Sequence, residues 1–264
     1  MDRQSLAAQY ATSKNLAARI ALHERCSTNR YGWQRWVFDR LGLQPGMRVL
    51  EIGAGTGSLW SENADRLPTG VEIVLSDFSI AMLKTAKGHV AFALPDVPFA
   101  DRSFDAVIAN HMLYHVEDRQ RGLAGIRRVL RDGGTLFAAT NGAQHLREIK
   151  ELMSDFGIAM GDVSSSFTLE NGDGQLRGVF PHVEREDYPD SFRIADPELL
   201  LGYIASVGPE AAEVVGARRE EIRAAIEKRM AADGAFHVVK STGLFGARAT
   251  PPPAPPSGGG PSLS

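Results

Sequence analysis

Three glycines at alternate positions, Gly53, Gly55 and Gly57, separate a short apolar run from a helix-like segment. Two acidic residues accompany them: Glu51 just before the turn, and Asp77 at the end of the next apolar run. Glycine allows torsion angles and a close backbone approach that a Cβ atom would block. In open α/β sheets, an acid about 20 residues after such a turn commonly binds ribose hydroxyls. The spacing therefore predicts a site for a nucleoside-containing cofactor.

The departures from the dinucleotide-binding pattern narrow the type of cofactor. A G-x-G-x-x-G fingerprint seats a pyrophosphate group on the N-terminus of the following helix. Here Ser58 occupies the position of the third glycine, and Glu51 would repel phosphate groups beside it. A cofactor with ribose hydroxyls and a cationic amino-acid portion suits Glu51 and Asp77 better. The alternative interpretation is a tight strand–helix turn that binds no ligand.

Strand-like and helix-like segments alternate from Met47 onward, and this alternation must position the glycine turn. It predicts a doubly wound α/β fold, in which helices cover both faces of a parallel sheet. Residues 1–45 are expected to form an N-terminal helical lid, and residues 46–248 the main domain, with an insertion at about 142–178. The tail of residues 249–264, rich in Pro, Gly and Ser, is expected to be disordered.

The overall composition excludes several classes of partner. The 264 residues include 29 Lys and Arg against 32 Asp and Glu, a formal charge of −3 that gives no global attraction to nucleic acid. No apolar run approaches the length of a membrane span, and the N-terminus lacks the pattern of a signal peptide. The single cysteine, Cys26, fits a reducing compartment. We therefore expect a cytoplasmic protein that binds a small molecule, without nucleic-acid or membrane partners.

Four motifs between about Met47 and Thr140 resemble, in order and spacing, those of class I S-adenosylmethionine-dependent methyltransferases. They read VLEIGAGTGSL, VLSDFSIAML, FADRSFDAVIANHMLYHV and IRRVLRDGGTLF. The resemblance implies a Rossmann-like seven-stranded sheet whose last strand is antiparallel, and it implies S-adenosylmethionine as methyl donor. The C-terminal stretch AFHVVKSTGLFGARA is similar to that last strand.

The resemblance also implies roles for individual residues. The glycines would approach the methionine portion and the ribose, Asp77 would bind the ribose hydroxyls, and Phe78 would pack on the adenine. Ala93 departs from the acid that usually holds the adenine amino group, which leaves the backbone N–H of Leu94. Asn110 would contact the methionine end. The implied cofactor-binding set is Glu51, Gly53, Gly55, Gly57, Asp77, Phe78, Leu94 and Asn110.

Three side chains after the fourth expected strand could take part in the chemistry. Methyl transfer needs an electron-rich atom held in line with the sulfonium methyl, and a base helps when that atom loses a proton. His111, Tyr114 and His115 lie in the stretch NHMLYHVED, at the edge that should face the reaction. Tyr114 and His115 are the catalytic candidates there. The alternative is that both only form a wall of the site.

Glu170 is the second candidate base. It lies in SSFTLENGDGQL, which resembles an insertion in a subset of small-molecule methyltransferases. If Glu170 were buried over the cavity, its pKa would rise and it would become a competent base. The alternative is a charge at a helix start or a structural hydrogen-bonding residue.

The N-terminal segment is expected to contribute to the acceptor site. A helix near Ser5 to Arg25 places Arg19 and His23 on one face, and Trp33 follows shortly after. Arg19 and His23 could hold a phosphate or carboxylate of the acceptor under a lid that excludes water. A solvated helix face is the alternative.

The expected function is transfer of a methyl group to a small organic acceptor, in specialised metabolism. One form is C-methylation of a prenyl diphosphate, with Glu170 as base and Mg²⁺ arriving only with the diphosphate. The alternative is O- or N-methylation of a phenol, carboxylate or amine, with His115 as base. A non-catalytic protein that binds S-adenosylmethionine is an alternative of another class. No catalytic metal is expected, because the histidines lack ligand spacing.

Overall fold

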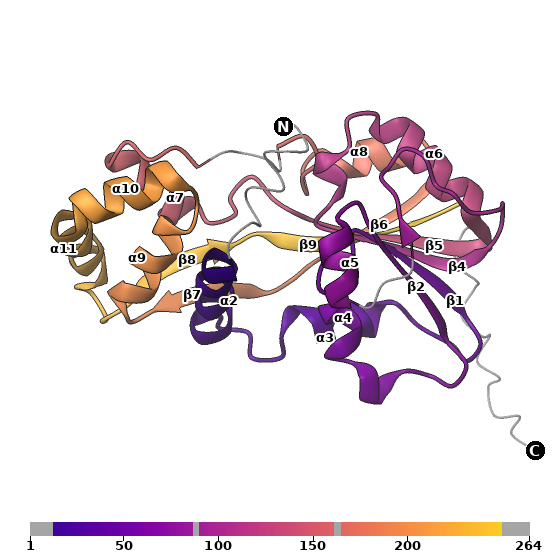
Figure 1. Cartoon of the computed structure of the whole chain (residues 1–264), viewed down its shortest axis with the longest axis horizontal. Coiled ribbons are helices and arrows are strands. Elements are labelled where there is room, and N and C mark those ends of the chain that lie inside the picture. The colour runs from indigo at the N-terminus through magenta and orange to yellow at the C-terminus, as the bar shows by residue number, and fades with distance from the viewer. Residues whose placement is uncertain (1–12, 87–89, 161–164, 250–264) are drawn as a thin grey trace, which may run out of the picture.

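The structure is a computed structural model that describes residues 13–86, 90–160 and 165–249. Most of the expected tail at 249–264 and the first residues of the expected N-terminal helix lie outside this described part. Figure 1 shows two lobes: one built around a large sheet, and one made mostly of helices. We call them the sheet lobe and the cap lobe.

Seven strands form the sheet of the first lobe, in the order β3-β2-β1-β4-β5-β9-β6. Strands β1 to β5 pair in parallel, whereas β9 runs antiparallel to both β5 and β6. The expected doubly wound sheet with an antiparallel last strand is therefore confirmed. The strands are β1 Arg48–Ile52, β2 Glu72–Asp77, β3 Val90–Ala91, β4 Phe104–Asn110, β5 Leu130–Asn141, β6 His182–Asp187 and β9 Thr242–Arg248.

Helices cover both faces of this sheet because buried side chains alternate along the strands. They are α3 Trp33–Arg40, α4 Ser58–Ser61, α5 Ile80–Ala86, α6 Arg119–Val129 and α8 Gly172–Arg177, with 3-10 turns at Ala64–Arg66 and Leu113–His115. Leu50 and Val107 pack in the cluster that includes α6 and α8, while Val49 and Ile108 pack with α3 and α4. The expected short helix at 34–41 corresponds to α3.

The cap lobe has its own hydrophobic core, formed by segments far apart in the chain (Figure 1). Its elements are α2 Ser13–Cys26, α7 Arg147–Asp155, β7 Asp190–Ile194, α9 Pro197–Ala205, α10 Pro209–Ala217, α11 Arg219–Met230 and β8 Phe236–Lys240. Strands β7 and β8 form an antiparallel pair. Leu22 of α2, Phe192 of β7 and Ile226 of α11 share one buried cluster, so the lobe folds around a common core.

The division of the chain differs from the expected one. The described part of the stretch 1–45, residues 13–45, does not pack as one unit, because α2 packs in the cap lobe and α3 packs on the sheet. From the described part of the insertion at 142–178, α7 and the residues beside it, such as Leu146 and Ile158, join the cap core, whereas residues 190–240 supply most of it. The stretch AFHVVKSTGLFGARA is two strands: β8 pairs with β7 in the cap lobe, and β9 enters the main sheet.

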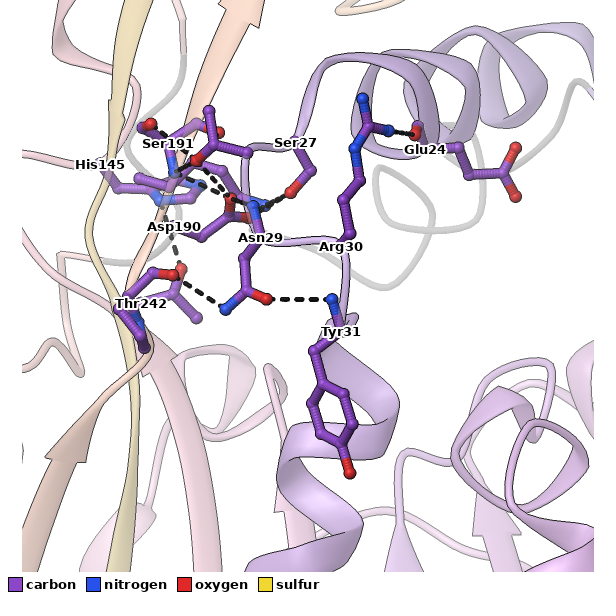
Figure 2. Close-up of polar contacts among 12 residues, drawn as sticks. Glu24, Ser27, Asn29, Arg30, Tyr31, His145, Asp190, Ser191 and Thr242 are labelled. Atoms are coloured by element: carbon purple, nitrogen blue, oxygen red, sulfur yellow. Dashed lines mark hydrogen bonds and ion pairs between the residues drawn. The ribbon is translucent and has the colours of Figure 1, made fainter.

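A buried ion pair lies where the two lobes meet. The Asp190 side chain is fully buried and the Lys240 side chain is 8% exposed, and the two form a salt bridge. Asp190 also accepts hydrogen bonds from the Ser27 hydroxyl and, at 2.9 Å, from the backbone N–H of Asn29 (Figure 2). Burial alone would raise the pKa of Asp190, but hydrogen bonds from Lys240 and Ser27 bring it below its ordinary value. The segment after α2 is thereby tied to the β7–β8 hairpin.

None of the helices in the described ranges combines the length and the apolar character that crossing a membrane requires.

Replacing Asp190 by Asn is expected to lower the free energy of unfolding by roughly 3–5 kcal/mol, because the buried Lys240 ammonium loses its counter-charge. Denaturant unfolding at neutral pH, followed by circular dichroism, measures this change. The double variant Asp190→Asn, Lys240→Met removes both charges and should recover most of the loss. A double variant no more stable than Asp190→Asn would show that the pair does not stabilise the junction.

Candidate active site

The turn after β1 has the backbone geometry that its glycines predict. Gly53, Gly55 and Gly57 have φ values of 73°, 57° and 75°, a region that side chains other than glycine rarely adopt. A Cβ atom on Gly53 would lie 3.0 Å from Met112 Cβ, and one on Gly57 would lie 3.3 Å from Ala86 Cβ. A Cβ atom on Gly55 would meet nothing within 4 Å. Gly53 and Gly57 therefore allow close packing, whereas Gly55 faces open space.

A cavity of about 270 Å³ lies beside this turn, at the carboxyl edge of β1 and β4. This is the edge at which open α/β sheets bind their ligands. Its walls come from the turn, the starts of α3 and α4, and the residues after β4. The lining residues are Trp33, Gln34, Glu51, Gly53, Ala54, Gly55, Thr56, Ser58, Leu59, Met82, Asn110 and His111.

Asp77 ends β2 beside the turn, as expected for a ligand of ribose hydroxyls. Its carboxylate accepts hydrogen bonds from the backbone N–H of Gly55 at 3.0 Å and of Ser79 at 2.8 Å. The next residue, Phe78, is 45% exposed, so an adenine ring could pack on it. Leu94 is half-buried after β3. The assignments of Asp77, Phe78 and Leu94 to the cofactor stay predictions that this placement fits.

Glu51 is a buried carboxyl group at the end of β1, and it is only 3% exposed. The indole N–H of Trp60 donates to it at 2.6 Å, and the Asn110 amide N–H lies at 3.5 Å. Burial raises the pKa of Glu51 to about 7, and the charge of Asp77 adds to the effect. At neutral pH this carboxyl group is therefore partly protonated, and a cation that enters the cavity would favour its ionised form.

Asn110 adds a second acceptor in the same place. Its side-chain Oδ1 is buried and has no hydrogen-bond partner among the residues that the structure describes. A buried acceptor without a donor is costly, so such an atom points to a missing donor. The ammonium group of S-adenosylmethionine supplies donors of this kind. The side chains of Glu51 and Asn110 thus fit the methionine end of that cofactor.

Of the three side chains proposed from the sequence after β4, His111 is the one that lines this cavity, whereas Tyr114 and His115 do not. It follows β4 with a φ of 50°, lines the cavity, and packs against Trp33 at a ring distance of 5.3 Å. Burial, and next the charge of Lys240, lower the pKa of His111 to about 4. His111 is therefore neutral at physiological pH.

Tyr114 and His115 lie in the 3-10 turn that follows, outside the cavity lining. Their rings contact each other at 4.5 Å, and both side chains are half-buried. Burial lowers the pKa of His115. Their catalytic roles remain predictions, and the cavity geometry favours His111 over both.

Glu170 does not meet the condition set for a base. Its side chain is exposed, and its two carboxylate oxygens each lie 3.1 Å from the backbone N–H of Ala143. Burial alone would raise the pKa of Glu170, but hydrogen bonds from Thr168 and Ala143 hold it below its ordinary value. The condition of burial over the cavity is not met, and Glu170 instead ties the loop before α8 to the loop after β5, which fits the alternative of a structural hydrogen-bonding residue.

Arg19 and His23 do not form the expected anion site. The Arg19 guanidinium donates to the backbone carbonyl of Ser206 at 2.9 Å, at the end of α9 in the cap lobe. The His23 ring packs edge-on against Phe192 at 4.9 Å. Burial, and next the charge of Lys240, lower the pKa of His23 to about 4. A neutral imidazole and a guanidinium bound to a carbonyl are poor ligands for phosphate.

Sequence reasoning missed two residues near the site. Tyr188 packs edge-on against Trp33 at 5.3 Å, extending the aromatic wall of the cavity toward the cap lobe. His145 follows the carboxyl end of β5, as His111 follows that of β4. The only available signal was this position after a parallel strand, where ligand-binding side chains gather.

Comparisons with known proteins agree with this geometry. Residues 50–138 match a family model described as a methyltransferase domain. A demethylmenaquinone methyltransferase of Renibacterium salmoninarum is 41% identical over 113 residues, 40% of this chain and 46% of that protein. The ubiquinone/menaquinone biosynthesis C-methyltransferase UbiE of Idiomarina loihiensis is 32% identical over 146 residues, 51% of this chain and 55% of that protein. The chain thus spans about half the length of these curated relatives.

Solved structures share the fold. A putative methyltransferase from an antibiotic biosynthesis pathway of Anabaena variabilis has a TM-score of 0.61 at 18% identity, covering 81% of this chain and 95% of that one. The family model and these curated relatives confirm the resemblance to class I S-adenosylmethionine-dependent methyltransferases, and the solved structure shares their fold. Within the described ranges, no three His, Cys, Asp or Glu side chains gather in a way that could hold a metal ion.

Affinity for S-adenosylmethionine is expected to rise between about pH 6 and about pH 8. The ammonium group favours ionised Glu51, whose pKa of about 7 leaves it partly protonated at the lower pH. Calorimetry in two buffers with different ionisation enthalpies should detect release of a proton on binding below pH 7. The variant Glu51→Gln should bind more weakly and lose this dependence. A wild-type affinity that is constant over the range would contradict the assignment of Glu51.

Proposed function

We propose that this chain, whose residues 50–138 form a methyltransferase domain, transfers the methyl group of S-adenosylmethionine to a small organic acceptor. One observation carries the proposal: beside a bare glycine turn, a cavity is lined by a buried carboxyl group, that of Glu51, and by a residue with an unpaired buried acceptor, Asn110 Oδ1. A structural turn without a ligand would have no reason to keep a buried amide oxygen unpaired.

Different side chains would bind different parts of the cofactor. Glu51 and Asn110 would hold the ammonium group, Asp77 the ribose hydroxyls, and Phe78 one face of the adenine. Gly55 leaves the backbone bare where the cofactor approaches. When bound, the cofactor supplies an electrophilic methyl group on a sulfonium. The protein has to place the accepting atom in line with it, roughly 3–3.5 Å away, and to exclude water.

The acceptor would approach from the side of the cap lobe. Trp33 and His111 form the cavity wall on that side, and Tyr188 extends it. This wall is aromatic and neutral, because the pKa of His111 is lowered to about 4. Such a wall suits an uncharged aromatic acceptor. The names of the relatives, which refer to menaquinone and ubiquinone biosynthesis, support an acceptor of this class.

A prenyl diphosphate acceptor receives less support. It would need cations for the phosphates and a base for the departing proton. Arg19 is bound to a carbonyl of the cap lobe, His23 is neutral, and Glu170 is exposed with a lowered pKa. The version with His115 as the base for O- or N-methylation would require this side chain to reach the cavity from the turn that follows His111.

The test is incubation of the purified protein with methyl-labelled S-adenosylmethionine and a panel of phenols, hydroquinones and amines, followed by mass spectrometry. Labelled product from a hydroxylated aromatic is the expected result. Absence of S-adenosylmethionine binding would refute the proposal, whereas binding without any labelled product would favour the non-catalytic alternative.

The variant Asn110→Leu tests the role of Asn110 in cofactor binding separately from its effect on stability. Asn110 Oδ1 is buried and unpaired, and the amide N–H makes only a long contact of 3.5 Å with Glu51, so an apolar replacement of similar size should change the melting temperature little. Affinity for S-adenosylmethionine should fall by about 10- to 100-fold, the range for a lost hydrogen bond to a charged group. Calorimetry and thermal melting measure the two quantities. Unchanged affinity would remove Asn110 from the cofactor site.

A further inference from the structure

The hydrogen bonds around Thr242 determine which nitrogen of His145 carries a proton. The Thr242 hydroxyl donates to Asn141 Oδ1 at 2.7 Å. The same hydroxyl oxygen lies 3.3 Å from His145 Nδ1. A hydroxyl group has a single proton, so it can only accept the bond from Nδ1. His145 therefore carries its proton on Nδ1, and its Nε2 presents a lone pair.

His145 lies at the edge of the sheet where the methyl group would be transferred. It follows β5, the neighbour of β4, and the backbone N–H of His111 donates to Ala139 of β5 at 3.0 Å. His111 itself lines the cavity beside the glycine turn. Within the part of the chain that the structure describes, Nε2 of His145 has no hydrogen-bond partner. His145 is not itself part of the cavity lining, but it lies close enough to His111 for the two side chains to interact electrostatically. A half-buried lone pair is thus left for a ligand near the cavity.

The surroundings keep His145 neutral. Burial lowers its pKa to about 3, and the charges of His111, His23, Lys240 and Lys150 act in the same direction. The pKa values of His111 and His23 are themselves lowered to about 4, and Lys240 is paired with Asp190. A histidine of this kind is a weak base but remains a good hydrogen-bond acceptor. An anionic group would be repelled by the lone pair.

We infer that His145 is a substrate-recognition residue, whose Nε2 accepts a hydrogen bond from the hydroxyl group of an uncharged, hydroxylated aromatic acceptor. The inference rests on the proposed methyl transfer and adds that the protein recognises the hydroxyl group of the acceptor. Thr242 and Asn141 are positioning residues, because they fix the tautomer of His145. The aromatic wall of Trp33 and Tyr188 supplies the packing surface for the ring.

The first test reads the tautomer directly. Long-range ¹H–¹⁵N NMR spectra of histidine-labelled protein at neutral pH should show His145 neutral and protonated on Nδ1. Thr242→Val removes the hydroxyl at nearly constant volume and should abolish this preference, whereas Thr242→Ser should keep it. A charged His145, or one protonated on Nε2 in the wild type, would overturn the inference without touching the proposed function.

The second test reads recognition of the hydroxyl group. Equilibrium dialysis against protein saturated with S-adenosylhomocysteine compares 1-naphthol with 1-methoxynaphthalene, which lacks the donor. The wild type should prefer 1-naphthol by about tenfold, in keeping with one hydrogen bond. His145→Leu should remove the preference, and His145→Gln, which restores an acceptor oxygen, should retain most of it. An undiminished preference in His145→Leu would refute the role of His145.

His237→Gln is the control, because His237 is an exposed cap-lobe histidine paired with Asp233 at 2.7 Å. It should bind both probes as the wild type does, and an equal loss of preference there would show that the effect is not specific to His145. Calorimetric binding of S-adenosylhomocysteine is measured first for every variant. Failure of the wild type to bind it would count against the proposed function. Normal binding without discrimination between the naphthalenes would count against the inference alone.

Discussion

A carboxyl group kept out of water at the end of β1 is the constraint around which the cofactor cavity is arranged. Removing a carboxylate from water costs several kcal/mol unless charges or hydrogen bonds compensate for it. Trp60 provides one strong hydrogen bond to Glu51 and Asn110 a long one, so the compensation is incomplete. A cation beside the glycine turn would complete the compensation of the Glu51 charge. The sheet, the turn and α4 together hold the Glu51 carboxyl group in this position before any ligand binds.

In the proposed reaction, the cap lobe gives the acceptor a surface separate from that of the cofactor. Its core is separate from those of the sheet, and it contributes neutral or paired groups at the junction. Lys240 and Asp190 cancel each other, and His23 is uncharged at neutral pH. The charged group of the candidate site, Glu51, therefore lies on the side proposed for the methyl donor. The groups that the cap lobe contributes at the junction are neutral or paired.

Local sequence patterns were enough to predict the sheet lobe. Glycines with positive φ, an acid at the end of β2 and an amide at the end of β4 each act within a few residues of a strand end, so their spacing reports their positions. The cap lobe depends on contacts that no local pattern records. Arg19 bonds to Ser206, 187 residues away, and that pairing turned an expected anion ligand into a structural link. Glu170 failed for the same reason, since its partner Ala143 lies outside the motif.

Strands β8 and β9 follow one another with only Ser241 between them, yet they belong to different sheets. One continuous ribbon therefore runs from the cap core to the carboxyl edge of β5 (Figure 1). Thr242, the first residue of β9, anchors His145, and Lys240, the last residue of β8, anchors the cap. Because only Ser241 separates these two anchors, the position of the cap lobe and the orientation of the His145 ring depend on the same short stretch of backbone.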